Sequence, residues 1–327
     1  MVLNGRFIAC ALVFAMVGGA LGCQPLESEP LVSDLLASDF LASGALVAGV
    51  DAAAPAARDT VTRPVLKTYA DTVAMRVYDA SGGPAAWEAL PFLGFNFSVM
   101  RQNERGRVFR HFWDRRTGAY RAELPGPANE PYVALFNVDT REGRVYWQGT
   151  ELDTVETPKM LDEAYRRYIN DTYWLLLPFK LFDPGVNRTY VPDSSDASFD
   201  VVHLSFGNVG LTPGDQYWLY VDKETGRLAR WTYVLESYGP DTPPRSFVWE
   251  DYEEHVTPEG SLFFATRKRG IGVPFAILTN EITTPSFDQV PDDIFTAIEA
   301  RLTPVDSTAS PFVPGGTRPP ASQKSKN

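Results

Sequence analysis

The chain has 327 residues, a formal net charge of −11 and 44% hydrophobic residues, including 20 Phe, 14 Tyr and 7 Trp. This apolar content is enough for one large or two modest domains, each with its own core. The acidic surface disfavours nucleic acid and anionic headgroups, because like charges repel, so we expect no nucleic-acid partner.

The first 22 residues have the layout of a signal peptide. Arg6 gives a positive start, and about fifteen apolar or small residues follow, fewer than the ~20 that a membrane-spanning helix needs. Ala20-Leu21-Gly22-Cys23 closes the run and resembles the lipobox of bacterial lipoproteins, which implies lipidation of Cys23. The alternative is an ordinary secretory signal that leaves Cys23 as a free thiol. Gln24, in place of Asp, indicates an outer-membrane anchor facing the periplasm if Gram-negative sorting rules apply.

Two segments flank the expected folded part. Residues 23–64, rich in Ala, Ser, Leu, Asp and Pro, predict a flexible tether after the lipidated cysteine. Residues 304–327 predict a disordered tail, because they contain too little apolar surface to bury. One domain is therefore expected over 65–303. Cys10 and Cys23 are the only cysteines, so this domain has no disulfide.

The domain is expected to begin with helices and continue with strands. Residues 68–78 predict a helix that ends at Gly82-Gly83-Pro84, and residues 85–90 predict a further helical turn. Apolar residues then alternate along 95–99 and 108–113, which predicts two strands joined by a hairpin at 104–106.

Three similar turns are expected to organise the rest of the sheet. They are residues 114–118, 139–143 and 222–226, each with the pattern Asp-x-x-Thr/Glu-Gly. The Asp side chain can accept hydrogen bonds from turn amides, and Gly can take a positive φ, so each turn predicts an antiparallel hairpin. One or two carboxylates per turn are too few for a calcium loop, and we predict no metal.

A helix and an aromatic run separate the two groups of strands. Residues 160–169 have the apolar spacing of an amphipathic helix, and 170–185 have polar ends around a nearly unbroken apolar centre. Further strands are expected at 200–206, 216–221, 228–236, 245–252, 262–267 and 275–284, with a short helix at 291–302. The element order predicts a mainly β (α+β) fold: a curved antiparallel sheet, or incomplete β-barrel, with covering helices.

Three runs resemble an uncharacterised bacterial lipoprotein-like family that is distantly similar to LolA/LolB-type lipoprotein carriers. They are residues 81–87, 111–115 and 168–180. The resemblance covers roughly 68–295 and implies a half-barrel whose helices cover an apolar cavity for acyl chains. No functional residue of those carriers can be matched one to one.

Catalytic chemistry has little support in the sequence. His111, His203 and His255 are isolated, and no nucleophile, metal or phosphate-binding motif occurs, so we expect no enzyme and no cofactor. Asn170 and Asp171 fit the capping of a helix end, with ligand contact as the alternative. A buried polar cluster around His111 or Asp171 with displaced pKa values would instead favour an enzyme.

The leading hypothesis is a lipid-anchored envelope protein that binds a hydrophobic small molecule or lipid, such as an acyl chain or lipoprotein anchor. The predicted ligand-binding residues are Trp113, Tyr173, Trp174, Leu176, Phe179 and Phe182. The same aromatic side chains could instead fill the half-barrel as core. A filled core would favour the alternative, a structural or interaction lipoprotein that engages an envelope protein partner.

Overall fold

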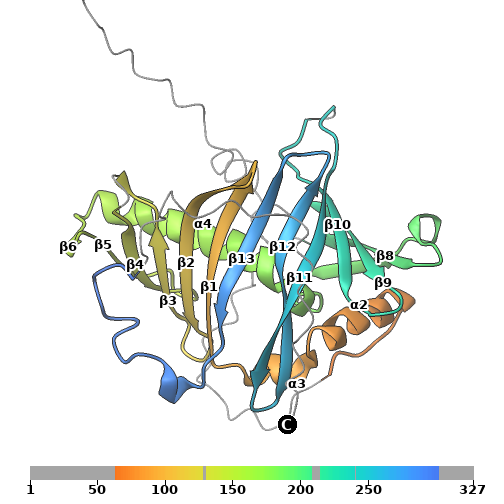
Figure 1. The fold of residues 1–327 in the computed structure, drawn as a ribbon, viewed down its shortest axis with the longest axis horizontal. Helices are drawn as coiled ribbons and strands as arrows, with labels where there is room; N and C mark the ends of the chain where they lie inside the picture. Colours follow the sequence, from red (N-terminus) through yellow and green to blue (C-terminus); the bar gives the residue numbers. More distant parts are fainter. Residues whose placement is uncertain (1–62, 128–129, 208–213, 240, 302–327) are drawn as a thin grey trace, which may run out of the picture.

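One open antiparallel sheet dominates the computed structural model, which describes residues 63–127, 130–207, 214–239 and 241–301. The strand order is β6-β5-β4-β3-β2-β1-β13-β12-β11-β10-β9-β8-β7, so the first and last strands do not meet (Figure 1). The strands are β1 Phe92–Arg101, β2 Glu104–Asp114, β3 Ala119–Leu124, β4 Tyr132–Asn137, β5 Gly143–Trp147, β6 Thr150–Glu151, β7 Val186–Tyr190, β8 Phe199–Phe206, β9 Gln216–Asp222, β10 Leu228–Val234, β11 Arg245–Thr257, β12 Gly260–Ile271 and β13 Phe275–Thr283. The predicted fold class is confirmed. The signal peptide, Cys23, residues 24–62 of the tether and the tail lie outside the described residues.

The helix α2 begins at a side-chain cap, and α3 begins at a glycine. α2 (Tyr69–Ala80) starts at Thr68, whose hydroxyl accepts from the Asp71 amide while the Asp71 carboxylate accepts from the Thr68 amide. Gly82 has φ +120°, and a Cβ there would lie 2.3 Å from the Ser261 carbonyl oxygen, so only glycine fits. Gly82-Gly83-Pro84 was predicted to end the first helix. Gly83 and Pro84 also form the first turn of the next helix, α3 (Gly83–Ala89).

The three Asp turns all connect neighbouring strands, as predicted. Gly118 and Gly226 take positive φ values of +75° and +73°. The turn between β4 and β5 differs, because there Arg141 has the positive φ, +61°. Gly143 instead lies in β5, where a Cβ would come within 2.3 Å of the Leu135 carbonyl oxygen.

The helix after the first group of strands is longer than predicted. α4 (Glu156–Leu176) continues through the aromatic run and passes into the 3₁₀ turn η2 (Leu177–Phe179). It runs across one face of the sheet, here called the inner face (Figure 1). No helix in the described ranges is both long enough and apolar enough to cross a membrane.

Other local expectations were wrong. The β1–β2 hairpin turns at Gln102 and Asn103, which both have positive φ, and not at 104–106. Strand β7 was not predicted. The expected helix at 291–302 does not form over the described part of that range, and the nearby regular element is the 3₁₀ turn η4 (Phe287–Gln289). A further 3₁₀ turn, η3 (Pro192–Ser194), follows β7.

The inner face carries two apolar clusters that meet under α4. The larger cluster joins α2, α3 and the C-terminal end of α4 to strands β1 and β8–β13. The smaller cluster joins the N-terminal part of α4 to β3, β4 and β5. Because one helix packs on both clusters, its position on the sheet determines how much of the inner face is filled.

Candidate functional site

The predicted aromatic block fills the larger cluster. Tyr173 and Phe179 are each 4% exposed, and Trp174 and Leu176 are each 1% exposed. The Trp174 ring lies 4.5 Å from the ring of Trp231. These side chains therefore occupy the inside of the curved sheet as core.

The other two predicted ligand-binding residues lie at the border of this core. Phe182 is half-buried, and its ring stacks on Tyr78 with centroids 6.4 Å apart. Trp113 is half-buried where both clusters meet, with its ring 5.5 Å from that of Tyr168. The structure thus brings four of the six predicted residues into one core and packs Phe182 and Trp113 against it, with Trp113 also against the smaller cluster.

A buried polar network lies at the junction of the two clusters. Nε2 of His111 on β2 is 2.9 Å from Oδ2 of Asp171 on α4, and both side chains are fully buried. The Tyr120 hydroxyl on β3 is 2.9 Å from Nδ1 of His111. Two further groups of α4 reach the carboxylate: Arg167 Nη2 at 3.0 Å and Asn170 Nδ2 at 2.7 Å.

Burial determines the protonation of this network. Desolvation lowers the pKa of His111, although the hydrogen bond and the charge of Asp171 act in the opposite direction. Desolvation also raises the pKa of Tyr120 well above its ordinary value. A neutral His111 donates from Nε2 to the carboxylate and accepts the Tyr120 hydroxyl at Nδ1, so each atom has a matching partner.

The capping prediction for Asn170 and Asp171 is wrong, because both residues lie inside α4 and both are buried. The displaced pKa values that would favour an enzyme are present. However, the three network side chains that could exchange protons, His111, Tyr120 and Asp171, are at most 1% exposed. Their contacts join α4 to β2 and β3. The sequence signal for this network is the i, i+4 spacing of Arg167 and Asp171 on a helix that continues past Ile169.

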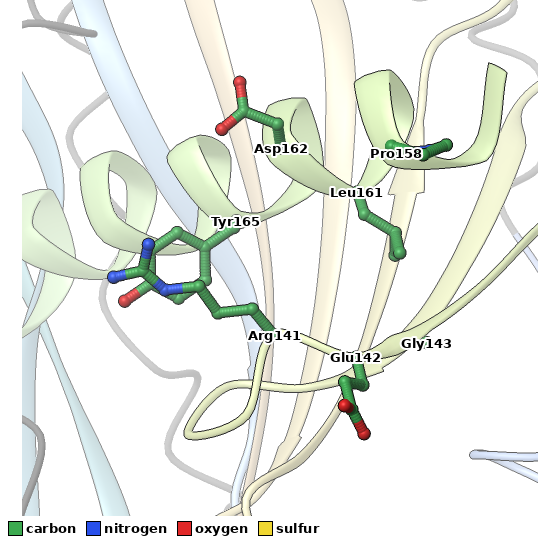
Figure 2. Close-up of a pocket in the computed structure, with 7 residues that line it drawn as sticks. All are labelled: Arg141, Glu142, Gly143, Pro158, Leu161, Asp162 and Tyr165. Atoms are coloured by element: carbon green, nitrogen blue, oxygen red, sulfur yellow. The ribbon is translucent and has the colours of Figure 1, made fainter. Parts of the chain in front are cut away.

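A hollow of about 440 Å³ lies between the N-terminal part of α4 and the β4–β5 turn. Its lining residues are Arg141, Glu142, Gly143, Pro158, Leu161, Asp162 and Tyr165. Figure 2 shows Leu161 pointing from α4 towards the turn, and Arg141 reaching from the turn to Tyr165. The Arg141 guanidinium lies 4.1 Å from the centre of the Tyr165 ring.

The hollow borders the smaller cluster. Tyr165 belongs to that cluster and Leu161 packs against it. Glu142, Asp162 and Arg141 add charged groups to this lining, so apolar and charged side chains border the same space. Leu161 and Tyr165 lie within the amphipathic helix predicted over 160–169, but no site was predicted there. Among the described residues, no group of three or more His, Cys, Asp or Glu could hold a metal ion.

No family model and no curated protein matches the chain. Among solved structures, it is similar to a LolA superfamily protein from Nitrosomonas europaea, with 11% identity, 70% of this chain and 97% of that chain covered, and a TM-score of 0.38. A domain described as an outer membrane lipoprotein-sorting protein, from Vibrio parahaemolyticus, is 9% identical over 69% of this chain and 95% of that chain, with a TM-score of 0.37. A DUF1329 family protein from Desulfovibrio piger is 11% identical over the same shares, 69% and 95%, also with a TM-score of 0.37. The chain is thus distantly similar to LolA-type proteins, as the sequence predicted.

Two aspartates of α4 provide a matched test of the network. Asp171 pairs with Arg167 and is fully buried, whereas Asp162 pairs with Arg166 and its side chain is 67% exposed. Asp171→Asn is expected to lower the free energy of unfolding by about 3–5 kcal/mol, because it leaves a buried guanidinium without its counter-charge. Asp162→Asn is expected to change it by less than about 1 kcal/mol. Urea unfolding measures both, and equal effects would contradict the assigned role of Asp171.

The buried His111 also predicts a pH dependence of stability. Its pKa is lowered from an ordinary value of 6.5, so the unfolded chain binds the proton first as the pH falls. The contribution of neutral His111 to the free energy of unfolding is therefore complete above about pH 6.5. It is lost as the pH falls from there towards the pKa of His111 in the folded protein, which is lower. Urea unfolding of His111→Gln between pH 7 and pH 5 should show a shallower loss of stability than the parent chain. The same substitution at the half-buried His203 is the control, and parallel curves for parent and His111→Gln would contradict the prediction.

Proposed function

We propose that this chain is a lipid-anchored cell-envelope protein that binds the apolar chain of a lipid or lipoprotein anchor under the N-terminal part of α4. The observation that carries the proposal is the hollow of about 440 Å³ beside the smaller cluster. Ligand sites commonly have volumes of about 300–1,000 Å³ and combine an apolar lining with a few polar groups. The acyl chain would lie against Leu161 and Tyr165, which line the hollow.

The filled half of the inner face limits where a ligand can lie. Tyr173, Trp174, Leu176 and Phe179 belong to the larger cluster, Phe182 packs against it, and none of them lines the hollow, so the ligand would lie on the side of the smaller cluster. Each methylene of the ligand that is buried in the site contributes about 0.8 kcal/mol to the free energy of binding. Two added methylenes therefore raise the affinity by roughly tenfold, until the available space is filled.

The cellular location is part of the proposal and rests on the sequence. The positive start, the apolar run and the lipobox-like end at Cys23 support export and lipidation, and Gln24 supports the outer membrane. The proposal includes no catalytic step, because the network around His111 has no exposed group that could meet a substrate.

A structural or interaction lipoprotein is the second candidate. The close packing of Trp174 against Trp231 and Phe247, with centroids 4.5 and 4.9 Å apart, supports it, because the larger cluster leaves no need for a ligand to complete the core. In that case an envelope protein would be the partner.

Acyl-lipid binding by the full chain with Cys23→Ser, which lacks its own anchor, distinguishes the two candidates. We expect native mass spectrometry to detect co-purified acyl lipid, and we expect added saturated fatty acids to bind more tightly with each added pair of methylenes. Leu161→Asp should lower this affinity at least tenfold, because it places a charge in the site. Val155→Asp is the matched control, since Val155 is 65% exposed and does not line the hollow. A lipid-free mass together with no uptake of added fatty acid would contradict the proposal and favour a protein partner.

A further inference from the structure

Charged side chains of both signs border the hollow between α4 and the β4–β5 turn. Arg141 and Glu142 extend from the turn, and Asp162 extends from α4. Asp162 is already paired, because its Oδ2 lies 3.2 Å from Nε of Arg166. Within the described part of the chain, by contrast, neither Arg141 nor Glu142 forms an ion pair. The border of the hollow therefore offers a cation and an anion to a ligand.

Hydrogen bonds of the turn fix the backbone of Arg141. The Arg141 amide donates to the Asn137 carbonyl at 2.8 Å. Oδ1 of Asn137 accepts from the amides of Asp139 and Thr140, at 2.9 and 3.2 Å. Arg141 itself has φ +61°, a conformation that few residues other than glycine adopt. The turn thus has a defined shape of its own, and Arg141 leaves it at a fixed point.

The Arg141 side chain is placed to bind an anionic group beside the apolar part of the hollow. Its guanidinium lies 4.1 Å from the centre of the Tyr165 ring, and Tyr165 is 7% exposed. Contact with the ring uses the flat face of the guanidinium, so its N–H groups stay available at the edge. A phosphate can accept from two of these N–H groups at once.

Glu142 makes the site unsuitable for a ligand that carries only negative charge. Figure 2 shows the side chains of Arg141 and Glu142 leaving the turn in different directions. Arg141 is the single positive group among the lining residues, whereas Glu142 and Asp162 are both negative. An anionic headgroup would meet this excess of negative charge, and the net charge of −11 on the whole chain acts in the same direction. A headgroup with one charge of each sign matches Arg141 and Glu142 together.

We propose that the ligand of this hollow is a single-chain lipid with a zwitterionic phosphoethanolamine headgroup. Arg141 binds the phosphate, Glu142 accepts from the ammonium group, and the acyl chain lies against Leu161 and Tyr165. A volume of about 440 Å³ lies near the lower end of the usual range for ligand sites, which favours one acyl chain. This inference rests on the proposed function and adds the headgroup that the site selects.

The test compares three lipids with the same lauroyl chain and different headgroups. They are lysophosphatidylethanolamine, lysophosphatidylglycerol and monolauroylglycerol, titrated below their micelle concentrations into the full chain with Cys23→Ser by isothermal titration calorimetry. The zwitterionic lipid should bind about three- to fivefold more tightly than either of the others, since exposed charge pairs contribute modestly. Salt at about 0.5 M should reduce this preference, because it screens the charges.

Two substitutions in the turn test the assigned contacts. Arg141→Gln should weaken lysophosphatidylethanolamine binding about three- to fivefold and leave monolauroylglycerol binding unchanged, which also shows that the variant is folded. Glu142→Gln should bring the affinities for the two phospholipids to within about twofold, because it removes both the ammonium acceptor and the repulsion. Arg144→Gln and Glu151→Gln are the matched controls, since these residues pair with each other at 3.8 Å and do not line the hollow. Neither control should change the order of the three affinities.

Equal affinities for the three lipids would overturn the headgroup assignment and leave acyl-chain binding in place. Equal effects of Arg141→Gln and Arg144→Gln would also overturn it, because the preference would then reflect the overall charge of the chain. If none of the three lipids binds, the proposed function fails together with this inference.

Discussion

The buried carboxylate of Asp171 connects α4 to the sheet. It accepts from Asn170, lies 3.0 Å from Arg167 on its own helix, and meets His111 on β2, which in turn contacts Tyr120 on β3. An apolar contact could slide along the sheet, but hydrogen-bonded groups in a buried setting have few alternative partners. The network therefore determines where α4 crosses the inner face.

That position divides the inner face into two unequal parts. On the C-terminal side of Asp171, the side chains of Trp174 and its neighbours fill the inside of the curved sheet and form the main core. Before Asp171, the helix packs on β3, β4 and β5 and leaves a hollow beside the β4–β5 turn. The inner face is thus filled by side chains at one end of α4 and has a hollow at the other. On the opposite face of the sheet, residues 287–301 pack against strands β1, β2 and β3.

The sequence predicted features that depend on neighbours along the chain. The Asp turns, the Thr68 cap and the alternating strands follow from local backbone chemistry, and the fold class follows from their order. Contacts between distant residues were not predictable in the same way. Asp171 was interpreted as a cap because its buried partner, His111, is 60 residues away. The aromatic run was compatible with a ligand wall and with a core, because composition cannot show whether a helix fills the inside of a curved sheet with its own side chains. Residues 291–302 were expected to form a helix, but the described part of that range forms only hydrogen-bonded turns, and Arg121 binds the carbonyls of Ala297 and Glu299.

Hydrogen–deuterium exchange along α4, with and without myristic acid, tests the central claim most directly. If Asp171 divides the helix into a fixed end and a ligand-binding end, residues 156–166 should exchange faster than 170–176 in the free protein. Myristic acid should then slow exchange in 156–166 and leave 170–176 unchanged. Uniform exchange along the helix, or protection confined to 170–176, would contradict the account.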